Sequence, residues 1–143
     1  MSAPAPTIDL QALRRALSML TEAQRFWSDQ ADGTPLKPHL RSAVIQSFEF
    51  SYELSVRMLR RLLIERAGSA PRVVDLSFND LLREAADAGL LSDPLRWRRW
   101  RDWRNATSHA YDEAKAQAVA QETLAFAEDA TDLLAAMEDQ LAG

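Results

Sequence analysis

The sequence predicts an all-α protein, an antiparallel up-and-down bundle of four to five helices. Glycine and proline are scarce, at four and six among 143 residues, and they fall between segments rather than within them. Inside the segments, leucines and aromatic residues recur every three or four positions, as in amphipathic helices. β-branched residues are few, and VVDL at 73–76 is too short to assign, so no strand competes with this interpretation.

The first two helices are predicted from apolar periodicity. The first covers about 8–30, where leucines stand at helical spacing, and the loop DGTPLKP at 32–38 follows it. The second covers about 38–67, and Gly68 suits the position after its last turn. We expect residues 1–7 to be a mobile N-terminus and 8–143 to form one helical domain.

The third and fourth helices are predicted from their ends. Ser77 with Asp80 three residues later resembles a capping box, and Gly89 closes that helix. Asp93 suits an N-cap and is followed by Pro94, whose missing N–H costs nothing in the first turn. The fourth helix should therefore begin at Pro94.

The last helix is predicted over about 112–141 and is rich in alanine and acids. Residues 1–110 carry a net charge of +3, whereas residues 111–143 carry −7. Averaged over the molecule, the protein is no binder of polyanions. Residues 96–104 nevertheless hold five arginines against the single acid Asp102, and such a local patch can bind phosphate because screening limits distant charges to about 8–10 Å.

Several functional classes find no support in the sequence. There is no cysteine, no apolar run of the ~18 residues that span a bilayer, and no secretory leader, so we expect a cytoplasmic protein without membrane contact. Neither phosphate-loop nor dinucleotide-binding glycine pattern occurs, which predicts no nucleotide cofactor of those kinds. The two histidines, His39 and His109, lie far apart, so we expect no metal site and give His39 no functional role.

The segment LRWRRWRDWR at 95–104 places three tryptophans, Trp97, Trp100 and Trp103, on one helix face. Core packing is the favoured interpretation, with base stacking as the alternative. At ~100° per residue, Arg104 lies about 20° from Trp97 on this face. An arginine there needs a partner. Arg104 either forms a structural ion pair with Glu49 or Glu53, or it is a cation that faces a ligand. Arg98 projects elsewhere.

His109 comes five residues after Arg104, so in an unbroken helix their side chains would diverge by about 140°. They converge only if the helix ends between Asn105 and His109. Asn, Thr and Ser in the segment NATSH weaken helices by bonding their own backbone, which favours such an end. Ser108 then lines the same pocket as Arg104.

The segment from Arg104 to Tyr111 matches Arg-x4-His-x-Tyr and resembles the motif of HEPN-type proteins. FEFSYEL at 48–54 and residues 81–113 resemble further parts of the HepT-like subgroup, also described as nucleotidyltransferase substrate-binding proteins. The resemblance implies a bundle that forms a homodimer around a shared cleft. It also implies a metal-independent ribonuclease, a toxin whose cognate minimal nucleotidyltransferase is the antitoxin and adds AMP to Tyr111.

The resemblance implies roles for individual residues. Catalysis falls to Arg104 and His109, because a histidine transfers protons near neutral pH and an arginine stabilises phosphorane charge. The supporting residues are Asn105, Ser108 and Asp102; Asp102 either pairs with Arg104 or Arg101 or is an acid on the helix surface. From the local basic patch, Arg101 and Arg98 are the candidate RNA-binding residues, with a solvated helix face as the alternative for Arg98. Tyr111 is the modification target, or a half-buried aromatic residue. The alternative function is a non-catalytic subunit that binds nucleotide or presents a substrate to the nucleotidyltransferase.

Overall fold

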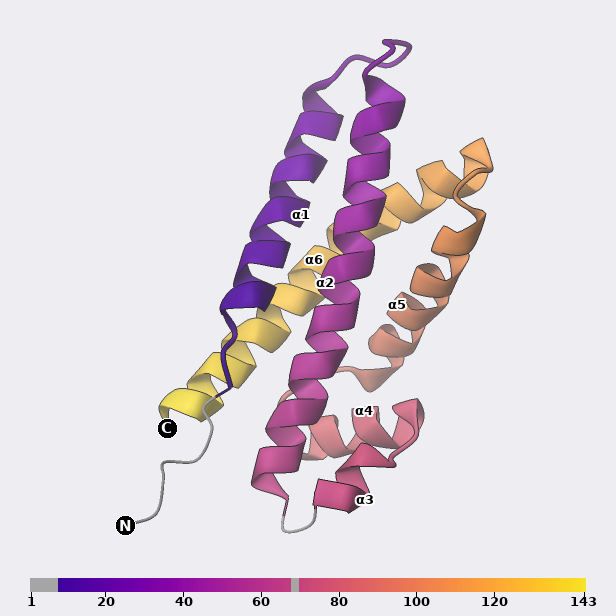
Figure 1. Cartoon of the computed structure of the whole chain (residues 1–143). Coiled ribbons are helices and arrows are strands. Elements are labelled where there is room, and N and C mark those ends of the chain that lie inside the picture. The colour runs from indigo at the N-terminus through magenta and orange to yellow at the C-terminus, as the bar shows by residue number, and fades with distance from the viewer. Residues whose placement is uncertain (1–7, 68–69) are drawn as a thin grey trace.

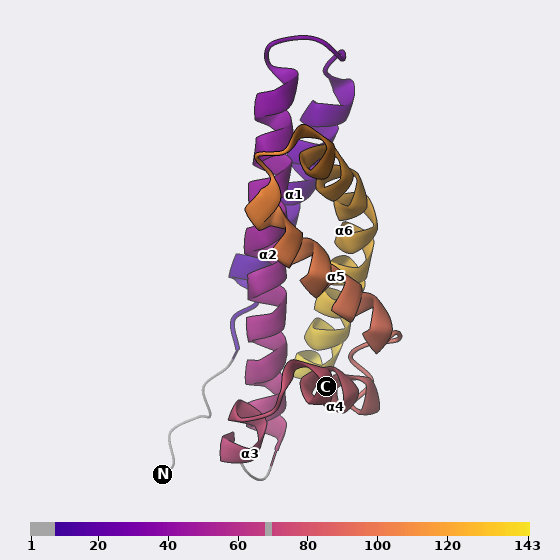
Figure 2. The ribbon, with the colours of Figure 1, turned by 90° about the vertical axis from the view of Figure 1, so that its right-hand side faces the viewer.

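The computed structural model describes residues 8–67 and 70–143, and four long helices dominate it (Figure 1). Helices α1 (Gln11–Asp29) and α2 (Lys37–Arg66) form an antiparallel hairpin. Helices α5 (Pro94–Ala106) and α6 (Glu113–Ala142) form a second antiparallel pair that packs against it (Figure 2). The short helices α3 (Ala70–Val74) and α4 (Phe78–Asp87) connect α2 to α5 at one end of the bundle. The predicted all-α, up-and-down bundle is confirmed.

The predicted helix starts are confirmed by side-chain caps. Ser77 Oγ accepts from the Asp80 N–H at 3.2 Å, and Asp93 Oδ1 accepts from the Leu95 N–H at 3.1 Å. Asp112 caps α6 through the Lys115 N–H at 3.0 Å. Each cap satisfies an N–H that has no partner within its helix, which fixes where the helix begins. Gly68 and residues 1–7, which also carried predictions, lie outside the described residues.

Helix α3 is the element that the sequence did not predict, and part of it falls on the VVDL stretch that was left unassigned. Five residues are too few to show a periodicity. A distant side chain instead supports its end, because the Arg60 guanidinium of α2 donates to the carbonyls of Val73 at 2.9 Å and Leu76 at 3.2 Å. The described chain therefore has six α-helices rather than four or five.

The core is centred on Phe126 of α6, which is completely buried. Its ring meets Phe48 edge-on at 4.9 Å between centroids and lies 5.8 Å from both Trp97 and Trp100. The two tryptophans are 3% and 1% exposed, so core packing is confirmed for them and base stacking is wrong. Such buried rings contribute both area and edge-to-face contacts to stability.

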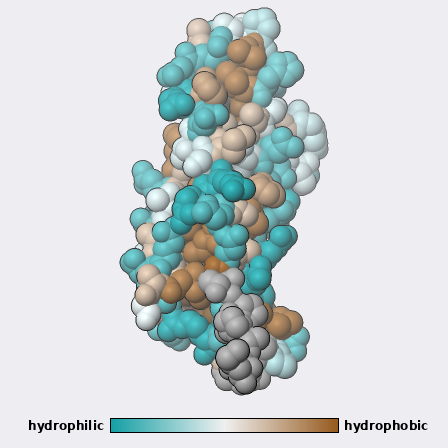
Figure 3. Space-filling view, turned by 60° about the vertical axis from the view of Figure 1, so that its left-hand side comes forward, coloured by the Kyte–Doolittle hydropathy of each residue, from teal (hydrophilic) through white to brown (hydrophobic). Residues whose placement is uncertain are grey.

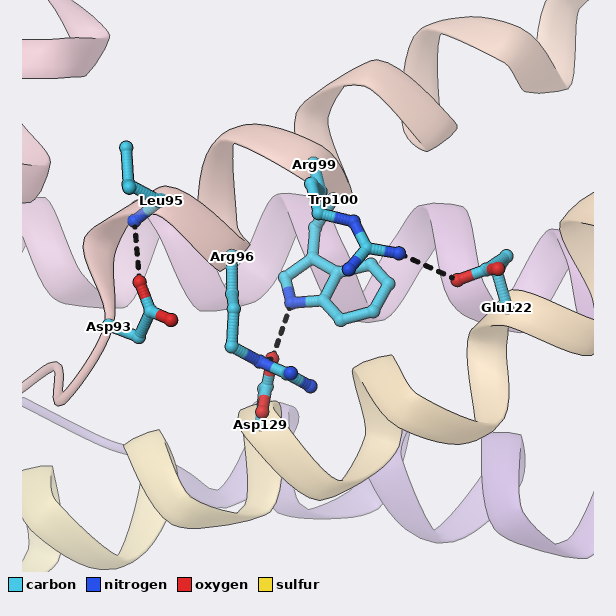
Figure 4. Close-up of polar contacts among 7 residues, drawn as sticks. All are labelled: Asp93, Leu95, Arg96, Arg99, Trp100, Glu122 and Asp129. Carbon is cyan, nitrogen blue, oxygen red and sulfur yellow. Dashed lines mark hydrogen bonds and ion pairs between the residues drawn. The ribbon is translucent and has the colours of Figure 1, made fainter.

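Two arginines of α5 face acids of α6 (Figure 4). Asp129 accepts from Arg96 Nε at 2.8 Å and from the Trp100 indole N–H at 2.7 Å. Arg99 lies 3.5 Å from Glu122 and is more exposed. The acid-rich final helix thus balances part of the arginine run. Arg98, Arg101 and Arg104 of the same run make no ion pair with α6 in the described chain.

The surface of the hairpin holds an apolar groove of about 540 Å³ between α1 and α2, where Met19 and Phe50 are exposed. Figure 3 views the α1 side and shows hydrophobic surface in areas divided by hydrophilic residues. Among the described residues, no helix combines the length and the apolar character that a bilayer span requires.

Candidate functional site

The candidate site lies where α5 ends. After Ala106 the chain makes a single 3-10 turn, η1 (Thr107–His109), before α6 begins. The Thr107 hydroxyl donates to the Arg104 carbonyl at 2.7 Å, and the Ser108 hydroxyl donates to the Asn105 carbonyl at 2.9 Å. These side chains bond the local backbone, which favours leaving the α-helix. The predicted helix end between Asn105 and His109 is confirmed.

Arg104 points from the last turn of α5 towards α2. Its Nη2 donates to Glu53 Oε1 at 2.6 Å, and its Nη1 lies 3.5 Å from Glu49 Oε2. Nη1 also donates to the Thr107 hydroxyl at 3.0 Å. The acids stand one helical turn apart, so a single forked guanidinium reaches both. Of the two interpretations of this arginine, the ion pair with Glu49 and Glu53 is the one observed, and its side chain keeps 27% of its surface exposed.

His109 and Tyr111 stand together on the surface beyond this ion pair. Tyr111 is 84% exposed, so the interpretation as a half-buried aromatic is wrong. Its hydroxyl lies 3.5 Å from His109 Nδ1, and the rings are 6.0 Å apart with an edge-on tilt. No hydrogen bond joins His109 to Arg104 among the residues that the structure describes. Their joint action on one phosphate stays a prediction.

The supporting residues differ from expectation in their contacts. Asp102 is exposed and forms no ion pair with Arg101 or Arg104 within the described chain, so of its two interpretations the acid on the helix surface is the one observed. The physical reason is the direction of the Arg104 side chain, which reaches the α2 acids instead. Asn105 and Ser108 are exposed, and the Ser108 hydroxyl is used by its own backbone. Their catalytic roles stay predictions.

The two arginines expected to bind RNA differ in their surroundings: Arg101 is packed against an aromatic ring, whereas Arg98 is free within the described chain. Arg101 lies 4.8 Å above the Phe78 ring, and its Nε is buried without a hydrogen-bond partner. Arg98 is exposed. A neutral hydroxyl lies nearby, because burial raises the pKa of Tyr52 to about 12 although the charges of Arg101 and Arg104 act in the opposite direction. Tyr52 thus keeps its hydroxyl proton at neutral pH. Tyr52 belongs to the segment FEFSYEL at 48–54, which the resemblance included without giving Tyr52 a role at the site.

Within the described part of the chain, no three histidine or carboxylate side chains gather as the ligands of a metal would. At the end of α5 the described chain presents one imidazole, one phenol and a guanidinium held by two carboxylates.

An up-and-down bundle with Arg-x4-His-x-Tyr at the end of its third long helix defines an all-α protein of the HEPN class. The chain belongs to the family of nucleotidyltransferase substrate binding protein like proteins, whose model matches residues 8–139. The HepT-like group named from the sequence is thereby confirmed.

Two relatives illustrate the family. A protein of Haemophilus influenzae described as "Probable ribonuclease HepT" is 39% identical over 97 residues, which span 68% of this chain and 66% of the relative, just under two thirds of its length. A solved structure from Haemophilus influenzae is described as the fold of a substrate binding domain of a nucleotidyltransferase. It is 33% identical, has a TM-score of 0.83, and the match covers 91% of this chain and 99% of that one.

Proposed function

We propose that this protein is a HEPN-type ribonuclease that works without metal, the toxin of a pair whose antitoxin is a cognate nucleotidyltransferase. One observation carries the proposal. An exposed histidine and an exposed tyrosine meet on a short turn directly after the helix that holds Arg104. The relative described as a probable ribonuclease supports the same assignment.

The proposed reaction is transfer of the phosphate to the neighbouring 2′-oxygen. The O2′–P bond forms, the P–O5′ bond breaks, and one proton passes from the 2′-hydroxyl to the leaving 5′-oxygen. His109 serves as base or acid in this exchange, and a homodimer supplies two such histidines to one cleft. Arg104 stabilises the charge that grows on the phosphorane. Glu49 and Glu53 hold its guanidinium in place beforehand.

Control by AMP transfer to Tyr111 fits the surface of this site. The hydroxyl is accessible, as a modifying enzyme requires, and lies 3.5 Å from His109. In this transfer the Tyr111 oxygen bonds to the α-phosphorus of ATP held by the nucleotidyltransferase, pyrophosphate leaves, and the hydroxyl proton is released. The phosphodiester formed brings bulk and negative charge to the imidazole, which would block access of RNA.

The test is cleavage of RNA by purified protein in the presence of a chelator. We expect the wild type to cut under these conditions and His109→Ala to lose cleavage with an unchanged melting temperature. His39→Ala is the matched control, since it removes the chain's other histidine, an exposed residue of α2, and should cut normally. Cleavage by His109→Ala at the wild-type rate would exclude the proposal.

A second function is favoured by a specific observation, the neutralisation of Arg104 by two carboxylates. A cation already balanced in this way suits a subunit that presents Tyr111 or a substrate to the nucleotidyltransferase, as the family description suggests. Co-expression with the neighbouring nucleotidyltransferase, followed by intact mass, separates the two. AMP on Tyr111 together with cleavage by the unmodified protein supports the toxin, whereas stable association without cleavage supports the presenting subunit.

A further inference from the structure

A second groove runs along α2 next to the Arg104 ion pair. Its volume is about 420 Å³. Tyr52, Val56 and Ile64, all buried or partly buried, contribute apolar surface to it. Arg57 and Arg61, one helical turn apart, are its exposed residues of positive charge. The groove thus combines an apolar floor with a basic rim.

The two rim arginines are free cations. Neither Arg57 nor Arg61 forms an ion pair or a side-chain hydrogen bond within the described chain. Arg60, which also lines the groove, is different because its guanidinium supports the end of α3 through the Val73 and Leu76 carbonyls. The one acid that lines the groove in the described chain, Glu53, is already paired with Arg104, so the two rim arginines keep their charge available for a polyanion. Binding through them leaves the bundle's own contacts undisturbed.

The groove is continuous with the candidate site. Glu53 lines the groove and also accepts the 2.6 Å hydrogen bond from Arg104. Tyr52 lines it as well, and the charges of both Arg101 and Arg104 act on the Tyr52 hydroxyl. Arg101 adds a cation whose buried Nε has no partner in the described chain. The groove surface that carries Arg57 and Arg61 therefore extends to the residues that surround Arg104.

We propose that this α2 groove binds the backbone of single-stranded RNA and delivers it to the end of α5. The inference rests on the proposed ribonuclease function and names the part of the surface that holds the substrate. Arg57 and Arg61 contact phosphates, and bases lie over the floor formed by Tyr52, Val56 and Ile64. An apolar floor beside a basic rim suits unpaired bases, whose faces are free to pack, better than a duplex, whose bases are already stacked.

The experiment measures binding to a short, fluorescein-labelled single-stranded RNA of mixed sequence by anisotropy, over a series of salt concentrations. All proteins carry His109→Ala, so that the RNA stays intact. The test variant adds Arg57→Ala and Arg61→Ala. The control adds Arg15→Ala and Arg25→Ala, which remove two exposed arginines from α1 and give the same change in net charge.

We expect the test variant to bind at least about tenfold more weakly, and its log–log salt slope to fall by about 1.4, or ~0.7 for each lost phosphate contact. The control should bind as the parent does. If the test and control variants show equal affinity and equal salt slope, the α2 groove does not bind RNA, even if the wild type cleaves RNA. A selective loss of binding in the test variant supports the groove, even if the wild type never cleaves, so the two proposals fail separately. The same measurement is made with a labelled RNA duplex. If the test variant loses affinity for the duplex and keeps its affinity for the single strand, the assignment to single-stranded RNA is wrong.

Discussion

Arg104 concentrates the interactions of the site in one side chain. It bonds two acids from α2 and the Thr107 hydroxyl that ends its own helix, so it joins helix termination to the packing of α2 against α5. A substitution at this position changes charge, contacts and local backbone together. Loss of activity in such a variant has to be judged beside its stability.

We predict that Arg104→Ala lowers the free energy of unfolding by about 1–2 kcal/mol, because it leaves Glu49 and Glu53 one turn apart without their cation. Glu53→Gln should cost less than about 1 kcal/mol, since the pair is partly exposed and Glu49 remains. Urea denaturation of both single variants and of the double variant measures the coupling. Additive effects would show that the contact contributes no stability.

Tyr52 and Tyr111 are the chain's two tyrosines, and they lie in opposite environments. Burial raises the pKa of Tyr52 to about 12, from 10.0 for a free tyrosine, whereas Tyr111 is exposed. The folded state therefore keeps the Tyr52 proton over a range in which the unfolded state releases it. The contribution of Tyr52 to the free energy of unfolding is fully present below about pH 10 and is lost as the pH rises towards 12.

Phenolate absorbance of the wild type and of Tyr52→Phe checks this prediction. The difference between the two titrations isolates Tyr52, and its midpoint should fall near 12. The variant should also lose part of the stability decrease between pH 10 and 12. A midpoint of Tyr52 at the ordinary tyrosine value would show that the hydroxyl is solvated.

At the scale of elements, the pairing of α5 with α6 depends on one partly buried carboxylate. Asp129 satisfies both the Arg96 guanidinium and the indole N–H of fully buried Trp100 (Figure 4). The hydrogen bond to Asp129 raises the pKa of Arg96 further, so this guanidinium stays charged at any ordinary pH. Glu122 makes the outer, longer contact with Arg99 at 3.5 Å.

We predict that Asp129→Ala destabilises the protein by about 2–3 kcal/mol, because a buried indole N–H is left without an acceptor. Glu122→Ala is the matched control on the same helix and should cost less than about 1 kcal/mol. Equilibrium denaturation by urea gives both values. Equal costs for the two substitutions would mean that the indole finds water instead.

At the scale of the molecule, the helices converge on Phe126. The ring comes from α6 and contacts Phe48 of α2 and both buried tryptophans of α5. The same contacts fix α5 against α2, and α5 carries Arg104 to the α2 acids. The core and the site are therefore connected through the placement of one helix.

We predict that Phe126→Ala lowers the free energy of unfolding by about 3–5 kcal/mol, as expected when a fully buried aromatic side chain leaves a cavity. Leu124→Ala offers a control on the same helix, since Leu124 is 54% exposed and should change stability by less than about 1 kcal/mol. Thermal and urea denaturation measure both. A small effect of Phe126→Ala would show that the core collapses around the missing ring.

The sequence by itself determined the features that depend on near neighbours along the chain. These are the four long helices, the caps at Ser77 and Asp93, and the helix end before His109, because periodicity and side chain–backbone bonds act over a few residues. The candidate motif from Arg104 to Tyr111 was likewise visible as a resemblance.

Only the tertiary structure decided the features that join distant residues. Helix α3 is supported by Arg60 from α2, and Arg104 pairs with Glu49 and Glu53 and not with its neighbour Asp102. Phe126 became the centre of the core although α6 reads as an alanine-rich helix, and Arg57 and Arg61 came to line a groove beside the site. Such outcomes depend on which helix faces meet, and a one-dimensional pattern specifies the faces but not their partners.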